Sequence, residues 1–332
     1  MVYSRERERD AYFEKFGDIY RLNCYPRNGK RDYLELLTRP FKLYFGIRKI
    51  CKEQGYDVIH CHNQRDEWIC LLAAKHAGVP IRIAHSHNTN SPKKKSFIEK
   101  FYRDLSPKMI KKTATVNIGC SKCACEDFFL HDRYIVVPNA VDMNKYSYDK
   151  RCKTKQIHFI HVGRYTYQKN QEFVLETFAE ICKTFKDAHL YLVGFGEPFE
   201  VQRLTMLIKT LGIDQNVEMV SGDTADISQY YAKSNYMIFP SRFEGFGIVL
   251  VEAQAMGIHC YVSENIQQEA DVGLLTFLEL SEGPKKWSEH IIADIQNGTR
   301  KSLDFEKLFQ YSNEIICKRY ADIYNAEAEL LK

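Results

Sequence analysis

Two glutamates, Glu244 and Glu252, stand eight positions apart at the end of a short apolar stretch. Between them, Gly245 and Gly247 bracket Phe246, and an apolar helix is expected to begin directly afterwards. A glycine turn that leads from a strand into a helix exposes backbone N–H groups, which together with the helix dipole suit an anion. The carboxylates add acceptors for hydroxyl groups. Phosphate-binding groups beside hydroxyl acceptors indicate a nucleotide sugar as the ligand.

A second loop carries two permanent positive charges. Gly163 follows a strand expected at 157–162 and lets the chain turn. Arg164 and Lys169 lie five positions apart in that turn. Two cations placed in this way can clamp a diphosphate, although loop cations are more often only solvated.

Two further loops of the second half also follow expected strands. Gly194 and Gly196 come after the strand at 188–193, where small residues let a ligand approach closely. In the segment 219–222, Val220 and its neighbours can present backbone groups and an apolar edge to a base. Ligands of doubly wound sheets bind at the carboxyl ends of the strands, so we expect these loops to meet in one site.

The elements that must position these loops alternate between strand and helix in both halves of the chain. With 332 residues, the chain is long enough for two domains. We expect a first domain at 1–144, a second at 145–304, and a helix at 305–332 that packs back toward the first domain. The predicted fold class is α/β, with two Rossmann-like doubly wound domains that face a cleft.

The expected strands and helices follow from short apolar runs and from helical periodicity, respectively. The strands are expected at 18–22, 56–61, 81–85, 115–119, 134–137, 157–162, 188–193, 217–220, 236–239 and 259–262. The helices are expected at 30–54 with a break near Pro40, and at 67–76, 97–113, 121–129, 171–183, 199–211, 226–233, 248–256, 287–297 and 305–331.

The cysteines and histidines of the first half raise the question of a metal site. Eleven cysteines, an odd number scattered over the elements, are typical of reduced thiols. Cys120, Cys123 and Cys125 lack a second pair or nearby histidines, so we do not expect zinc there. His60 and His62 share one face of a strand end. We interpret them as a polar strand tip, with a metal site as the alternative.

Charge is distributed unevenly along the chain. Residues 1–150 contain 28 Lys and Arg against 18 Asp and Glu, a net charge of +10, whereas the remainder has a net charge of −6. Basic residues mixed with aromatic ones, at 39–49 and 93–112, are typical of a solvated helix face, of contact with an anionic membrane or, less well, of nucleic-acid binding. We expect no nucleic-acid partner, because no reading motif accompanies the charge.

No apolar run is long enough to span a membrane, and residues 1–8 do not resemble a signal region. The sequence therefore predicts a cytoplasmic protein, with its basic first domain available for peripheral contact at the inner face of the membrane.

Five segments together resemble family 4 of the retaining glycosyltransferases, which have the GT-B fold. The segments are 83–88, 137–142, 163–169, 192–196 and 240–252, so the resemblance covers nearly the whole chain. The two glutamates in their strand–turn–helix setting are the most specific part, and Ala140 stands where the family usually has glycine. Within that family, the segments are most similar to those of bacterial exopolysaccharide and capsule enzymes. This resemblance implies a hexosyltransferase or a related glycosyltransferase.

The resemblance implies a role for each residue of the site. Arg164 and Lys169 would hold the donor diphosphate and stabilise it as it leaves. Glu244 would bind hydroxyls of the donor sugar and Glu252 those of the ribose, while the backbone at 245–247 would contact sugar and phosphates. No metal or other cofactor is expected, because the cations and the helix N-terminus take its place.

The resemblance also implies an active-site histidine at the end of a strand in the first domain. His85 and His87 lie two positions apart and share a face. We favour His87, which precedes a polar turn, as the residue that contacts the donor sugar or the acceptor hydroxyl. A histidine that is merely hydrogen-bonded at a strand tip is the alternative.

The implied reaction transfers a sugar, with retention, from a nucleotide sugar, in the first place a UDP-linked one, to a lipid-linked or growing saccharide. Family members begin with a strand, a glycine-rich loop and a long helix that have no counterpart here, so we expect the first domain to lack its N-terminal β–α unit. The alternative function is therefore a catalytically impaired nucleotide-sugar-binding protein. A sugar epimerase of similar architecture is a further alternative.

Overall fold

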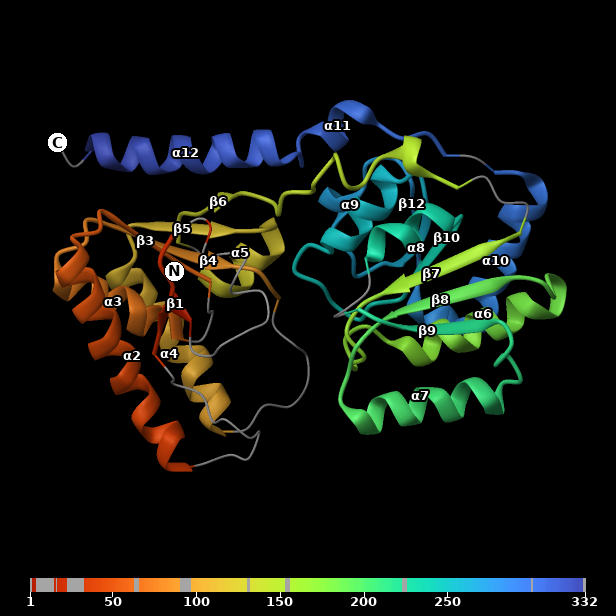
Figure 1. Cartoon of the computed structure of the whole chain (residues 1–332), viewed down its shortest axis with the longest axis horizontal. Coiled ribbons are helices and arrows are strands. Elements are labelled where there is room, and N and C mark those ends of the chain that lie inside the picture. The colour runs from red at the N-terminus through yellow and green to blue at the C-terminus, as the bar shows by residue number, and fades with distance from the viewer. Residues whose placement is uncertain are drawn as a thin grey trace. The chain divides into compact units, whose positions relative to one another are not determined.

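The computed structural model describes residues 2–3, 15, 17–22, 33–62, 66–89, 97–129, 132–152, 156–222, 226–299 and 301–330. The chain divides into two compact units (Figure 1). The first comprises Met1–Val137 and Tyr320–Lys332, and the second comprises Pro138–Arg319. The sequence placed the first boundary after residue 144 and separated the helix at 305–332, whereas in the structure the second unit extends to Arg319.

The first unit is built on a parallel sheet with the order β3-β4-β5-β6. Its strands are β3 (Val58–Cys61), β4 (Ile81–Ser86), β5 (Val116–Gly119) and β6 (Ile135–Val136). The middle strands, β4 and β5, are almost entirely buried, as expected for a parallel sheet that is covered on both faces. A separate parallel pair joins β1 (Val2–Tyr3) to β2 (Tyr20–Arg21).

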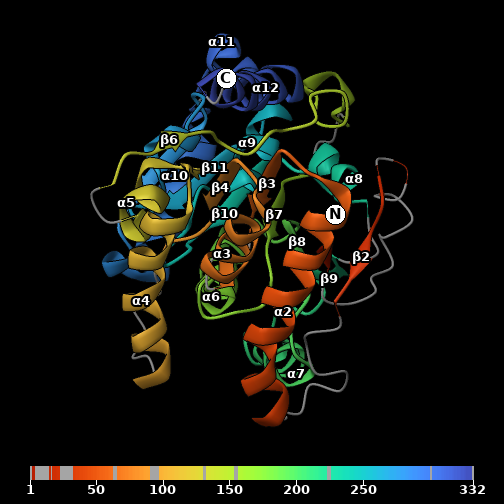
Figure 2. The ribbon, with the colours of Figure 1, turned by 90° about the vertical axis from the view of Figure 1, so that its left-hand side faces the viewer.

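Among the described residues, the helices that accompany this sheet are α2 (Tyr33–Gln54), α3 (Glu67–Ala77), α4 (Phe97–Thr113) and α5 (Lys122–Phe129). Figure 2 shows α2 and α3 running side by side. The predicted break near Pro40 is wrong, because α2 continues through this residue. A proline inside a helix costs about 3 kcal/mol. Burial of Leu43 and Ile47 against the neighbouring elements offsets this cost.

The second unit contains a six-stranded parallel sheet with the order β12-β11-β10-β7-β8-β9. The strands are β7 (His158–Val162), β8 (His189–Gly194), β9 (Val217–Ser221), β10 (Tyr236–Phe239), β11 (His259–Ser263) and β12 (Leu275–Leu278). The strand order reverses between β7 and β10, which lie next to each other. Such a switch point is where doubly wound sheets bind ligands, at the carboxyl ends of the strands. The sequence did not predict β12.

The helices of the second unit are α6 (Gln171–Thr184), α7 (Pro198–Thr210), α8 (Ile227–Lys233), α9 (Ile248–Ala255), α10 (Gly283–Asn297) and α11 (Phe305–Phe309). Figure 1 shows α6 and α7 on one side of the sheet and α8 and α9 on the other. Trp287 of α10 is fully buried and packs edge to face on Phe173 of α6, with ring centroids 5.0 Å apart. The last helix, α12 (Asn313–Leu330), begins in the second unit, and its residues from Tyr320 onward belong to the first.

The basic and aromatic surface that the sequence indicated is only partly visible. The lysines at 93–95 and the side chains of 97–103 lie outside the described residues. On α2, Phe41 and Phe45 are 65% and 60% exposed, and Lys42 and Lys49 are exposed on the same helix. No helix in the described part of the chain has both the length and the apolar character needed to cross a membrane.

Candidate functional site

Two loops at the switch point of the second unit are joined by hydrogen bonds. The loop after β7 offers the Gln168 carbonyl to the Arg242 N–H (2.8 Å), and Gln168 Nε2 donates to the Phe243 carbonyl (2.9 Å). Asn170 Nδ2 donates to the Pro240 carbonyl (3.1 Å), and its Oδ1 accepts from Arg242 Nη2 (2.7 Å). These hydrogen bonds hold the loop after β7 against the loop after β10.

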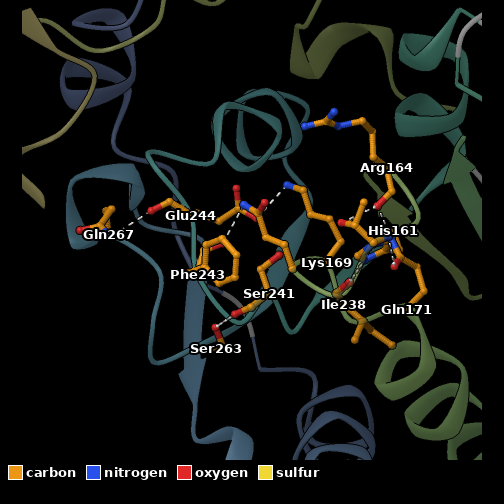
Figure 3. A network of polar contacts seen from close by, with 12 residues as sticks. His161, Arg164, Lys169, Gln171, Ile238, Ser241, Phe243, Glu244, Ser263 and Gln267 are labelled. Carbon is orange, nitrogen blue, oxygen red and sulfur yellow. Dashed lines mark hydrogen bonds and ion pairs between the residues drawn. The ribbon is translucent and has the colours of Figure 1, made fainter. Parts of the chain in front are cut away.

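A nearly buried ion pair lies where these loops meet. Lys169 Nζ is 2.8 Å from Glu244 Oε1, and the two side chains are only 16% and 7% exposed (Figure 3). The same ammonium lies 4.7 Å from the centroid of the Phe239 ring, a cation–π contact. Because an ammonium has three N–H donors, Lys169 keeps donors for a ligand after pairing with Glu244.

Glycines let the loops after β7 and β8 approach each other. A Cβ on Gly163 would lie 3.0 Å from Lys169 Cδ, so glycine here leaves room for the lysine stem. A Cβ on Gly194 would lie 2.1 Å from the Gly163 carbonyl oxygen, and one on Gly196 would lie 2.7 Å from Tyr165 Cβ. The prediction that a ligand approaches the chain at the glycines at 194 and 196 stays a prediction. In the structure these glycines permit the close approach of the chain to itself.

The side chain of Arg164 is exposed, whereas its backbone carbonyl is hydrogen-bonded to a buried polar network. Gln171 Nε2 donates to the Arg164 carbonyl (2.9 Å) and lies 3.3 Å from His161 Nε2. His161 Nδ1 in turn lies 2.9 Å from the Ile238 carbonyl oxygen. Burial, with a smaller effect of the nearby Lys169, lowers the pKa of His161 to about 4 against the opposing effect of the hydrogen bond to Ile238, so this imidazole is neutral at pH 7. Figure 3 shows the side chains of Arg164 and Lys169 extending toward the same side.

Sequence reasoning missed this network. His161 stands inside an apolar strand, and Gln171 opens the helix that follows, so each looked like an isolated polar residue. A fully buried histidine in such a strand needs a partner, which is the signal that could have pointed to Gln171.

The glycine turn before α9 has the predicted form. Gly247 has a φ of +82°, which glycine adopts without strain, and directly precedes α9. Gly245 and Phe246 are buried, and the ring of Phe246 lies 5.5 Å from that of Tyr311. The backbone of 245–247 thus leads into the N-terminus of α9, where N–H groups and the helix dipole favour an anion.

Glu252 lies within α9 and has a perturbed pKa. Tyr231 Oη donates to Glu252 Oε2 at 3.2 Å. Burial raises the pKa of Glu252 to about 7, against the opposing effects of the Tyr231 hydrogen bond and of Lys145. This carboxyl group can therefore change its charge near neutral pH when a ligand donates hydrogen bonds to it.

The structure brings several of the predicted residues of the second unit together. The ends of the neighbouring strands β7, β8 and β10, or the loops directly after them, contain Gly163, Arg164, Lys169, Gly194, Gly196 and Glu244 to Gly247. Val220 is buried in β9, beyond β8 in the same sheet. His87 belongs to the first unit, half-buried directly after β4, and His85 is buried within that strand, with the two rings 4.0 Å apart.

Two family models match the chain in succession. Residues 1–145 match the glycosyltransferase family 4 model, and residues 142–272 match that of the glycosyl transferases group 1. Both contain residues predicted above for the site, His87 in the first and the loops after β7, β8 and β10 in the second.

Relatives and solved structures agree with these matches. A UDP-Gal:alpha-D-GlcNAc-diphosphoundecaprenol alpha-1,3-galactosyltransferase of Escherichia coli is 26% identical over 250 residues, which are 68% of this chain and 62% of that protein. The capsular polysaccharide biosynthesis glycosyltransferase CapH of Staphylococcus aureus is 24% identical over 269 residues, 78% of this chain and 74% of that protein. The crystal structure of Anabaena Alr3699/HepE in complex with UDP has a TM-score of 0.76 at 18% identity and covers 98% of this chain and 91% of its own.

The paired parallel-sheet units, the switch-point loops and the two successive family matches lead to one conclusion. The chain consists of a glycosyltransferase family 4 domain followed by a glycosyl transferases group 1 domain, has the GT-B fold and is a transferase enzyme.

Proposed function

We propose that the chain transfers a sugar from a UDP-linked donor to a lipid-linked or growing saccharide in polysaccharide biosynthesis. The ion pair between Lys169 and Glu244 carries this proposal, because it sets a cation and a hydroxyl acceptor 2.8 Å apart at the switch point. The names of the relatives support the substrate class, since one of them uses UDP-Gal and a diphosphoundecaprenol acceptor. Anabaena HepE has been crystallised with UDP and glucose.

The donor diphosphate would be held by charges and backbone donors together. Arg164 is exposed and free to turn toward a phosphate, whereas Lys169 is held in place by its carboxylate partner. The backbone at 245–247 and the N-terminus of α9 add N–H groups that suit phosphate oxygens. These groups supply the positive potential that a divalent ion supplies in metal-dependent enzymes. We therefore propose that transfer does not need a metal.

The donor sugar and the ribose would be held by the two glutamates. Glu244 accepts hydrogen bonds from sugar hydroxyls while its charge remains balanced by Lys169. Glu252 accepts hydrogen bonds from the ribose hydroxyls, which favour its ionised form. Its raised pKa then makes donor affinity depend on pH near neutrality.

The chemical step that fits these groups retains the anomeric configuration. The acceptor hydroxyl oxygen attacks the anomeric carbon from the face that the diphosphate leaves. The C–O bond to the diphosphate breaks, and a diphosphate oxygen takes the proton of the acceptor hydroxyl. Arg164 and Lys169 stabilise the charge that develops on the leaving group. His87 contacts the donor sugar or the acceptor hydroxyl.

Removal of either member of the ion pair tests this assignment. Lys169→Ala and Glu244→Ala are expected to abolish transfer from a UDP-sugar, measured as release of UDP and formation of a glycosylated lipid-linked acceptor. The matched control is Lys183→Ala, which removes the lysine of an exposed pair with Glu180 (2.6 Å) in the same unit. Unchanged turnover in either site variant would refute the roles given to these residues.

Three further readouts resolve the finer parts of the proposal. NMR of the product gives the anomeric configuration, and inversion would contradict the front-face mechanism. Transfer that is lost with a chelator and restored by Mg²⁺ or Mn²⁺ would contradict metal independence. Calorimetry that finds donor binding while no acceptor yields product would favour the impaired binding protein instead.

We also propose that the first unit docks on an anionic membrane surface at the inner face of the membrane, through α2. Phe41 and Phe45 lie one helical turn apart and are largely exposed, with Lys42 and Lys49 on the same helix. Exposed aromatic rings with adjacent cations suit the boundary between headgroups and acyl chains. Co-sedimentation should increase on vesicles that contain phosphatidylglycerol and should drop in Phe41→Ser/Phe45→Ser. Equal binding to neutral vesicles would contradict the proposal.

A further inference from the structure

Four histidines gather at the carboxyl ends of two neighbouring strands in the first unit. His60 is on β3 and His62 follows it, while His85 is on β4 and His87 follows it. The two strands are parallel and hydrogen-bonded, so their ends coincide. The ring centroids of His60 and His85 are 5.1 Å apart, those of His62 and His85 are 4.9 Å apart, and those of His60 and His62 are 4.3 Å apart.

The ring nitrogens of this cluster point toward one another. His60 Nε2 lies 3.0 Å from His85 Nδ1. His60, His62 and His85 each offer one nitrogen, and these three atoms lie within 4.8 Å of one another. Two imidazole nitrogens bound to Zn²⁺ at their usual length of about 2.0–2.1 Å are roughly 3.3 Å apart in a tetrahedral arrangement. The first pair already has that separation, and the third nitrogen needs a side-chain shift of at most about 1.5 Å.

Groups around the cluster orient two of its rings. Tyr324 Oη lies 2.7 Å from His60 Nδ1, which leaves His60 Nε2 to face His85. His62 Nδ1 lies 2.7 Å from His87 Nε2. Histidines that ligate a metal use their other nitrogen for such a hydrogen bond, which fixes the tautomer and the ring orientation.

We propose that His60, His62 and His85 form a binding site for one transition-metal ion of the Zn²⁺ type, with Tyr324 and His87 as the groups that orient its ligands. A set of three imidazoles is typical of Zn²⁺ and also suits Co²⁺ and Ni²⁺, whereas Mg²⁺ prefers oxygen ligands. The ion would bind to the first unit alone and would tie the end of β3 to the end of β4.

Titration with the metal alone tests this site. The full chain, without a histidine tag and stripped with a chelator, is titrated with Co²⁺ and then with Zn²⁺. We expect visible Co²⁺ absorption of tetrahedral strength that Zn²⁺ displaces, one bound Zn²⁺ per chain by elemental analysis, and a higher melting temperature with Zn²⁺. Absence of the absorption together with less than one Zn²⁺ per chain would overturn the proposal, whatever the transferase activity is.

Substitutions assign the ligands. His60→Ala and His62→Ala are each expected to weaken Zn²⁺ binding by more than about 100-fold, and Tyr324→Phe by about 10- to 100-fold, as is usual for groups that support a ligand. The matched control is the double variant His158→Ala/His189→Ala, which removes two neighbouring histidines of the second unit with rings 5.9 Å apart. Equal loss in the control, or unchanged affinity in the His60 and His62 variants, would refute the site.

Discussion

Glu252→Gln tests the burial of a carboxyl group in the donor half of the enzyme without any ligand. The folded state holds the pKa of Glu252 at about 7, whereas the ordinary value is 4.5. A raised pKa means that the folded state binds the proton more tightly than the unfolded state does. The stabilisation is therefore complete below pH 4.5 and is lost as the pH rises through about 7.

The size of this effect follows from the shift. One pKa unit corresponds to about 1.4 kcal/mol, so between pH 4.5 and pH 8 this group lowers the free energy of unfolding by about 3 kcal/mol. Glutamine keeps the shape and cannot ionise, so Glu252→Gln should be more stable than the parent at pH 8 by up to that amount and nearly equal at pH 5.

Denaturant unfolding at pH 5, 6, 7 and 8 provides the assay. Trp287 is fully buried in the second unit, and Trp68→Phe removes the tryptophan of the first unit, so fluorescence in that background reports on the second unit. The matched control is Glu306→Gln, which changes an exposed glutamate of α11. If the parent and Glu252→Gln lose stability equally between pH 5 and pH 8, the burial argument for Glu252 is refuted.

Two further predictions concern the same loops. The affinity for a UDP-sugar should fall about fivefold between pH 7 and pH 6, because protonated Glu252 accepts ribose hydroxyls poorly, and Glu252→Gln should bind more weakly with no such dependence in calorimetry. Gly194→Ala should lower the free energy of unfolding by about 1–3 kcal/mol and weaken donor binding, because its Cβ would meet the Gly163 carbonyl at 2.1 Å. Equal stability and donor affinity in parent and Gly194→Ala would contradict the packing of these loops.

The sequence predicted the alternation of strands and helices and the loops that carry the site, because glycine turns after apolar strands are local signals. It assigned Lys169 to a diphosphate and Glu244 to a sugar, but it did not predict that they pair. The ion pair depends on β7 and β10 lying side by side, which is a property of the strand order. Similarly, His60 and His62 could be placed on one face, whereas their contact with His85 requires the adjacency of β3 and β4.

The helix predicted at 305–331 is divided into α11 and α12, and β12 and α2 were also not predicted correctly, for different physical reasons. The strand β12 has only four residues, too few for a clear alternating pattern, so its strand character depends on pairing with β11. In α2, local reasoning expected Pro40 to break the helix. Tertiary burial of the residues that follow Pro40 outweighs that local preference.

The close packing of Gly163 against Gly194 has a consequence for redesign of donor preference. Gly194 cannot accept a side chain without pushing the loops after β7 and β8 apart, whereas a Cβ on Gly163 would press on the Lys169 stem within its own loop. Between Gly194 and Gly196, however, Phe195 is 43% exposed while its carbonyl is bonded to the Tyr165 N–H (2.7 Å). A variant library that seeks a new sugar specificity should keep the glycines and vary residue 195. The side chain there can change because it is exposed, while the backbone hydrogen bond to Tyr165 is kept.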